Sequence, residues 1–132
     1  MRVGRVVGTT EYPKRSSMAI RPAIIRFASD KVSPHGVRPE ILLALQIAAP
    51  LFAEYEADCI ITSMTDGVHG PTTLHHKGLA VDLRSHHLTQ TDKLGLVDDL
   101  RDLLPPYYEV YLEDVNGPNE HIHIEYDWKG AV

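Results

Sequence analysis

Residues 121–125 read His-Ile-His-Ile-Glu and alternate strictly between ionisable and apolar side chains. Successive side chains of a β-strand point to opposite faces, so this pattern predicts a strand with one apolar face and one imidazole face. The apolar face is expected to pack against a core. Imidazoles on the other face are typical of a strand that lines a metal site or a catalytic cleft.

Composition supports one small domain in which this chemistry is concentrated. The chain has 132 residues, of which 43% are hydrophobic and 23% are charged, as in one globular domain. It contains eight histidines, and seven of them lie between His69 and His123. Cys59 is the single cysteine, so no intramolecular disulfide can form. The fold must therefore depend on its core or on a bound metal, and Cys59 is expected to be a buried, inert thiol.

Charge and hydropathy argue against several classes of protein. The formal net charge of −5, with no long basic run, argues against a nucleic-acid partner. The most apolar stretch, residues 41–53, is shorter than the roughly 20 residues of a membrane-spanning helix. Residues 1–20 also lack the apolar run of a secretory signal. We expect a soluble protein made in the cytoplasm, without a membrane span, and a monomer.

The spacing of apolar residues predicts an α+β fold, with a small and mainly antiparallel sheet packed against helices. Residues 1–132 are expected to form a single domain, with residues 1–18 as an irregular arm. The predicted elements are an edge strand within 19–27, helices at 40–56 and 89–104, and strands at 58–63, 79–84, 107–113 and 121–126, the last two as a hairpin. The first helix is expected to be buried on nearly all sides and kinked at Pro50. The core face of the second is expected to comprise Leu94, Val97, Leu100, Leu103 and Leu104.

A second motif precedes and enters the strand at 79–84. Alternation directs Leu79, Val81 and Leu83 to the core and Ala80, Asp82 and Arg84 to the opposite face. Gly78 allows a turn that returns His75 to the same site as Asp82. Together with one hairpin histidine, these side chains supply two nitrogens and one oxygen. Such a set suits zinc, with a fourth position open for water.

Two carboxylates flank the hairpin turn and are candidate general bases. Glu113 ends the first strand of the hairpin, and Glu120 immediately precedes His121. A zinc-activated water needs such a base nearby. His35, His86 and His87 are expected to be ordinary surface histidines.

The motif His75-x-x-Gly78-x-Ala80-x-Asp82, followed by His121-x-His123, resembles the zinc D-alanyl-D-alanine carboxypeptidase superfamily. That superfamily includes L-alanyl-D-glutamate endopeptidases and the zinc fold of the hedgehog signalling domain. The resemblance extends over residues 59–126, and residues 61–67 are similar to the family's strand and loop leading into the site. Thr73 stands where the family usually has a serine two residues before the first histidine.

The resemblance implies a role for each matching residue. His75, Asp82 and His123 match the zinc ligands, and His121 matches a histidine that stabilises the reacting oxygen. Two positions fit the general base: Glu120 by its close spacing to His123, and Glu113 by its place at the end of the preceding strand. Strand alternation favours Glu113, because Glu120 would point away from both histidines. Arg84, His69 and Thr73 are the expected substrate-binding residues.

The implied activity is that of a zinc-dependent peptidase that hydrolyses peptidoglycan stem peptides at a D-Ala-D-Ala or an L-Ala-D-Glu bond. The alternative is a zinc-stabilised binding module of the same fold that catalyses nothing. Without a secretory signal, cell-wall degradation fits a phage lysis or virion protein, and cytoplasmic muropeptides are the other expected substrate.

Overall fold

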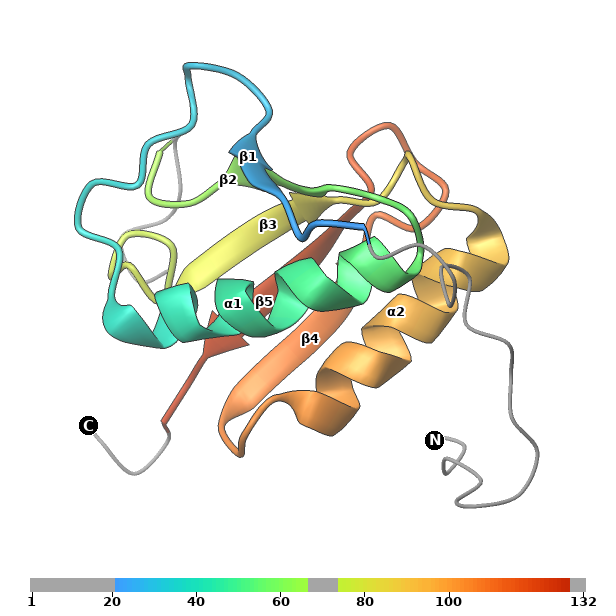
Figure 1. Ribbon diagram of the computed structural model, residues 1–132. Coiled ribbons are helices and arrows are strands. Elements are labelled where there is room, and N and C mark those ends of the chain that lie inside the picture. Colours follow the sequence, from blue (N-terminus) through green and yellow to red (C-terminus); the bar gives the residue numbers. More distant parts are fainter. Residues whose placement is uncertain (1–20, 67–73, 129–132) are drawn as a thin grey trace.

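The computed structural model describes residues 21–66 and 74–128, so the expected arm at residues 1–18 lies outside the described residues. The fold is α+β, with five strands and two helices in the described ranges (Figure 1). In chain order the elements are β1 (Ile25–Phe27), α1 (Pro39–Glu54), β2 (Cys59–Ser63), β3 (Ala80–Arg84), α2 (Gln90–Leu103), β4 (Tyr108–Glu113) and β5 (His121–Tyr126).

The five strands form one mixed sheet in the order β1-β2-β3-β5-β4. β1 pairs with β2 in parallel, whereas the β2–β3, β3–β5 and β4–β5 pairs are antiparallel. The expectation of a mainly antiparallel sheet was therefore wrong. The reason is the α1 crossover between β1 and β2, which returns the chain to the sheet in its original direction.

Both helices cover the same face of the sheet, and the hydrophobic core lies between the helices and that face (Figure 1). Val81, Leu83, Ile122 and Ile124 reach this core from β3 and β5 and are fully buried. This confirms the predicted apolar faces of both strands. Cys59 is buried in the same core, as predicted. The opposite faces of β3, β4 and β5 are left for polar side chains.

Helix α1, predicted at 40–56, begins at Pro39 and continues through Pro50 to Glu54. Its burial is less complete than expected. Leu42 and Leu43 are 49% and 44% exposed, because the sheet and α2 cover only part of the helix circumference.

Helix α2 begins after Thr89, whose hydroxyl accepts a hydrogen bond from the backbone N–H of Asp92. Its buried stripe is centred on Leu96, Val97 and Leu100. The predicted core positions Leu94 and Leu103 are instead 53% and 54% exposed. Leu94 lies about 120° around the helix from Leu100, outside the stripe that contacts the sheet.

Neither helix of the described ranges has the length and apolar character that crossing a bilayer requires.

Candidate metal centre

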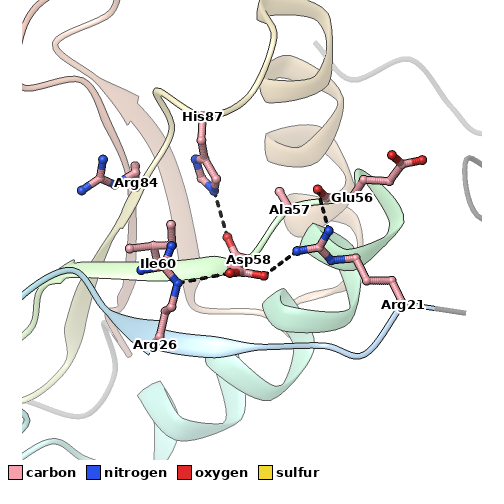
Figure 2. Close-up of a pocket in the computed structure, with 8 residues that line it drawn as sticks. All are labelled: Arg21, Arg26, Glu56, Ala57, Asp58, Ile60, Arg84 and His87. Atoms are coloured by element: carbon pink, nitrogen blue, oxygen red, sulfur yellow. Dashed lines mark hydrogen bonds and ion pairs between the residues drawn. The ribbon is translucent and has the colours of Figure 1, made fainter.

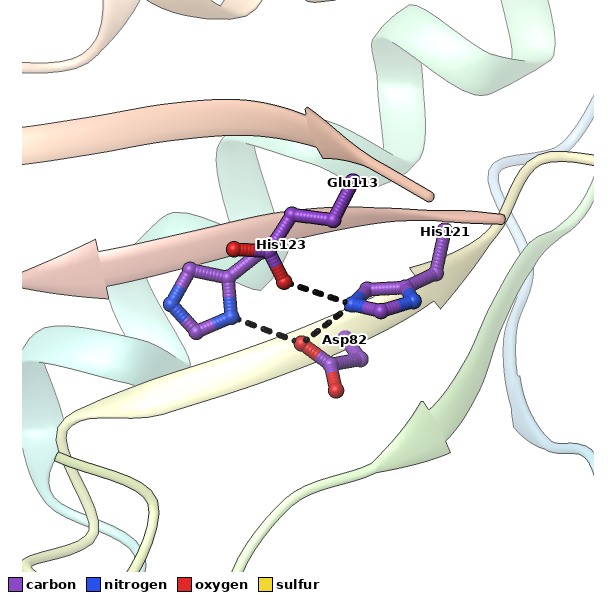
Figure 3. Close-up of side chains that lie close together, drawn as sticks. All are labelled: Asp82, Glu113, His121 and His123. Carbon is purple, nitrogen blue, oxygen red and sulfur yellow. Dashed lines mark hydrogen bonds and ion pairs between the residues drawn. The ribbon is translucent and has the colours of Figure 1, made fainter. Parts of the chain in front are cut away.

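The register of three neighbouring strands brings ionisable side chains together on the polar face of the sheet. Asp82 of β3 pairs with His123 of β5, and Glu113 of β4 pairs with His121 of β5. Figure 3 shows these four side chains pointing toward one another from the three strands. One ligand atom from each lies within 4.8 Å of the others. The sheet therefore presents a compact group of two imidazoles and two carboxylates.

His75 reaches the same group through the turn that precedes β3. Gly78 closes this turn with a positive φ of 74° and donates a backbone hydrogen bond to the His75 carbonyl. A Cβ at Gly78 would lie only 2.2 Å from the carbonyl oxygen of Gly36, so the position requires glycine. The turn brings His75 Nε2 to 3.3 Å from Asp82 Oδ1.

Three histidine nitrogens converge on a single oxygen, Asp82 Oδ1. His123 Nδ1 lies at 2.8 Å, His75 Nε2 at 3.3 Å and His121 Nε2 at 3.6 Å. Burial alone would raise the pKa of Asp82, but hydrogen bonds with His123 and His75 outweigh burial and hold that pKa well below its usual range. Asp82 is therefore an anionic centre surrounded by imidazoles.

The second nitrogen of each ring is anchored by an acceptor outside the group. Nδ1 of His75 donates to the Met64 carbonyl at 2.6 Å, Nδ1 of His121 to the Asn119 carbonyl at 2.6 Å, and Nε2 of His123 to Glu125 at 2.8 Å. An acceptor on one nitrogen requires a proton there and leaves the other nitrogen of a neutral ring free to bind a cation. Such outer contacts orient histidine ligands in metal sites.

Protonation of the histidines depends on the same contacts. Burial opposes a charged ring, but Asp82 and Glu125 overcome it and raise the pKa of His123 to about 9. Asp82 likewise raises the pKa of His75 against the effect of burial. The His123 ring thus carries positive charge at neutral pH when no cation is bound. A divalent cation bound at this group would supply positive charge in place of that proton.

The two candidate bases occupy different environments. Glu113 Oε1 lies 2.9 Å from His121 Nε2, and its side chain is 46% exposed, so it is open to a substrate. Glu120 is only 3% exposed and lies away from this group. It accepts hydrogen bonds from the Lys93 amine, the Ser85 hydroxyl and the Asn116 backbone, at 2.6, 2.6 and 2.9 Å. The structure brings Glu113, and not Glu120, to the histidines.

The hairpin loop explains the orientation of Glu120. Asp114 and Asn116 adopt positive φ values of 50° and 66°, which curl the loop. The Asp114 carboxylate also accepts a hydrogen bond from the Asn119 backbone N–H. The loop therefore delivers Glu120 to the helix side of the sheet, immediately before β5 places His121 on the polar side.

The remaining predicted residues that the structure describes lie outside this group. Arg84 is exposed on β3 and pairs in register with His121. His69 and Thr73 lie outside the described residues. His35 and His76 are exposed, and the rings of His86 and His87 contact the carbonyls of Pro118 and Asp58 at 3.3 and 2.9 Å.

Two residues of the site were missed by the sequence predictions. Glu125 anchors His123, and the Tyr111 ring stacks beside His123 with centroids 6.1 Å apart. Tyr111 is 40% exposed, and its hydroxyl contacts Glu109. The period of two along each strand was the available signal, because it places Glu125 with His123 and Tyr111 with Glu113.

The donor set is that of a possible metal-binding group. Imidazole nitrogens combined with carboxylate oxygens suit zinc and other divalent first-row metals, whereas Ca²⁺ and Mg²⁺ prefer oxygen alone. No family model, curated protein or solved structure matches this chain.

Proposed function

We propose that the protein is a zinc-dependent peptidase that hydrolyses peptidoglycan stem peptides. The observation that carries the proposal is the convergence of three anchored histidines on Asp82, with Glu113 beside them on an open face. His75, Asp82 and His123 are the proposed ligands. A zinc ion held by them would supply Lewis acidity, which lowers the pKa of a bound water and polarises a peptide carbonyl.

The neighbouring side chains supply the remaining chemistry. Glu113 accepts a proton from the attacking water and passes it to the leaving amine. His121 donates Nδ1–H to the Asn119 carbonyl, so it would stabilise the developing charge as an imidazolium, with Nε2–H donating to the reacting oxygen. Glu125 positions His123. The exposed ring of Tyr111 forms one wall of the site.

The substrate assignment depends on the resemblance of the His75–Asp82 and His121–His123 motifs to zinc carboxypeptidases and endopeptidases of the cell wall. The scissile bond would be D-Ala-D-Ala or L-Ala-D-Glu. A peptidase of this kind fits wall degradation by a phage lysis or virion protein, or the processing of cytoplasmic muropeptides.

A zinc-stabilised module without turnover is the second candidate, and the position of His121 favours it. With His121 as a fourth ligand beside His75, Asp82 and His123, the protein itself would close the coordination shell. Structural zinc sites have four protein ligands, whereas catalytic sites keep one position for water.

Defined muropeptides separate these two functions. Purified protein, with its zinc content measured, is incubated with peptides ending in D-Ala-D-Ala and with peptides containing L-Ala-D-Glu, with and without chelator, and the products are identified by mass spectrometry. We expect cleavage of one bond, loss of cleavage on chelation and recovery on adding zinc. His123→Ala should abolish cleavage, and His86→Ala, which alters a histidine outside the group, should retain it.

Other results would decide against the peptidase. Full hydrolysis after exhaustive chelation rejects the zinc mechanism. Stoichiometric zinc without cleavage of any peptide favours the non-catalytic module. Purified protein that holds less than about a tenth of an equivalent of zinc, and does not take up more, rejects both functions.

A further inference from the structure

A pocket of about 410 Å³ lies on the described part of the chain at β1, β2 and β3, and three arginines are among the residues that line it (Figure 2). Arg21, Arg26 and Arg84 contribute three guanidinium groups, while Asp58 and Glu56 contribute two carboxylates. The chain as a whole has a net charge of −5, so this local excess of positive charge runs against its composition. A lining of this kind favours an anionic ligand.

Internal ion pairs use only part of this cationic charge. Asp58 accepts from Arg21 Nη2 at 2.6 Å and from Arg26 Nε at 3.1 Å, and these hydrogen bonds lower the pKa of Asp58. The Nη atoms of Arg26 form no hydrogen bond or ion pair within the described ranges, and its side chain is 53% exposed. His87 donates to the Asp58 carbonyl, so the backbone beneath the pocket is also satisfied.

Arg84 is the unpaired cation of the pocket. Its side chain is exposed and forms no ion pair or hydrogen bond in the part of the chain that the structure describes. Figure 2 shows its guanidinium pointing away from Asp58, on the same side as the Arg26 guanidinium. Two guanidinium groups with free N–H donors thus border one hollow. Guanidinium groups bind carboxylates through two parallel hydrogen bonds.

The same residue joins the pocket to the candidate metal centre. Arg84 follows Asp82 by two positions on β3, so both side chains leave the same face of the sheet. It also pairs in register with His121. Arg26 lies on the far side of the pocket, paired in register with Ile60 of β2, another lining residue. A peptide lying across the sheet from His121 would meet Arg84 first and then Arg26.

We propose that this pocket is an anion subsite in which Arg84 and Arg26 bind a carboxylate of the peptide substrate. The inference rests on the proposed peptidase function for the identity of that substrate. Two carboxylates of a stem peptide share the required chemistry: the free carboxylate of D-Glu and the C-terminal carboxylate. The subsite would bind one of them while the scissile carbonyl lies at the histidines.

Binding of an acetylated pentapeptide, L-Ala-γ-D-Glu-L-Lys-D-Ala-D-Ala, tests this subsite. Three versions are compared by calorimetric titration: both carboxylates free, the D-Glu carboxylate amidated, and the C-terminus amidated. The host is zinc-saturated Glu113→Gln protein, and mass spectrometry confirms that the peptide stays intact. We expect one of the two amidations to weaken binding about tenfold or more, the usual effect of losing a charge-assisted hydrogen bond.

Arginine variants in the same host locate the effect. Arg84→Gln and Arg26→Gln should each weaken binding of the peptide with both carboxylates free. Each should also remove most of the loss of affinity, or penalty, caused by the amidation that weakens binding to the host protein, because the carboxylate and the guanidinium act as a pair. Lys31→Gln removes one positive charge from an exposed loop and should leave the penalty unchanged.

The outcomes separate this inference from the proposed function. The subsite is rejected if neither amidation weakens binding, if the penalty persists in both arginine variants, or if no version binds at millimolar concentration. If the wild-type protein hydrolyses the peptide and any of these results is obtained, the peptidase function is supported and the subsite is rejected. Carboxylate-dependent binding without hydrolysis supports the subsite and counts against the peptidase.

Discussion

The three histidines that face Asp82 differ in the group that accepts a hydrogen bond from the other nitrogen of each ring. Backbone carbonyls anchor His75 and His121, whereas the Glu125 side chain anchors His123. A backbone acceptor cannot be removed by substitution, but a carboxylate can. His123 is therefore the proposed ligand whose orientation is most open to a direct test.

Glu125→Ala should weaken zinc binding about 10- to 100-fold, the usual effect of removing an outer-shell partner of a histidine ligand. Competition with a chromogenic chelator measures this affinity. Asp30→Ala is the control, because it removes one exposed carboxylate from a loop outside the group of ionisable side chains. Equal affinity in the Glu125→Ala protein and the wild type would remove the positioning role.

Glu113→Gln should lower kcat by about 10²- to 10⁴-fold, because a general base contributes that much to proton transfer. Glu120→Gln should retain kcat at temperatures where the variant is folded, since Glu120 is buried beside Lys93 and Ser85. Steady-state hydrolysis of the cleaved muropeptide provides both values. The reverse result, with Glu120 essential and Glu113 dispensable, would contradict the assignment of the base.

Glu120 should instead stabilise the fold in a pH-dependent way. Burial would raise its pKa, but hydrogen bonds from Asn116, Lys93 and Ser85 lower the pKa to about 2, from 4.5 for a free side chain. A depressed acid stabilises the folded state above its unfolded pKa, and that contribution is lost as pH falls through the folded pKa. Glu120→Gln should therefore cost about 3 kcal/mol at neutral pH, where it leaves Lys93 unpaired.

Urea unfolding of the wild type and Glu120→Gln as a function of pH checks this. The difference in unfolding free energy should shrink as pH falls from 4.5 toward 2. A difference that does not change with pH would show that the Glu120 charge contributes nothing.

The turn before β3 restricts which residues its positions can accept. Gly78 and Gly36 both have positive φ, at 74° and 79°, so alanine is strained at either position. Only a Cβ at Gly78 would collide with backbone, 2.2 Å from the Gly36 carbonyl oxygen, while a Cβ at Gly36 would meet nothing within 4 Å. The two glycines form a natural pair of test and control.

Gly36→Ala should cost about 1 kcal/mol of stability, and Gly78→Ala about 2–4 kcal/mol, because only Gly78→Ala adds a backbone collision to the strain. Denaturant unfolding measures both losses. Gly78→Ala should also weaken zinc binding, since the turn carries His75. Equal losses for the two variants would mean that the close approach at Gly78 has no energetic effect.

At this scale, much of the structure follows from local patterns. Alternation was enough to assign the faces of β3 and β5, and helical spacing placed α2 within 89–104. The exposure of Leu94 and Leu103 could not be predicted, because helical spacing defines a stripe but not which stripe the sheet covers. The environment of Glu120 could not be predicted either, because Lys93 and Ser85 are distant from Glu120 in sequence and contact its carboxylate only in the folded protein.

The molecule as a whole assembles the candidate centre from one turn and three strands, and its stability should depend on the metal. A cation that binds only the folded state stabilises it by about 2.7 kcal/mol at 100 times its dissociation constant. Zinc should therefore raise the Tm of the wild type, and chelator should reverse the shift. Calorimetry on His123→Ala should show little zinc shift, and His86→Ala should show the full one.

A zinc shift of equal size in His123→Ala and the wild type would place the bound metal elsewhere.

The parallel pairing of β1 with β2 is the global feature that the sequence did not reveal. β1 has only three residues, all exposed, so its side chains hold no pattern that fixes its direction. Its direction follows from the path of α1 across the sheet, which is a property of the whole fold. The residues that converge on Asp82 were predicted, but the contacts that anchor their rings were not. Only the Met64 carbonyl comes from another segment of the chain, whereas Asn119 and Glu125 each lie two residues from the histidine that they anchor.

The strand order also bears on how the protein is made. β5 follows β4 in the chain, yet it lies between β3 and β4 in the sheet. While a ribosome is still synthesising the chain, the edges of β3 and β4 that will receive β5 remain unpaired, and His121 and His123 are absent from the sheet. A nascent chain therefore has neither a complete sheet nor a complete metal group until residue 126 has emerged. Under the proposed function, a hydrolase built in this order stays inactive until β5 has left the ribosome.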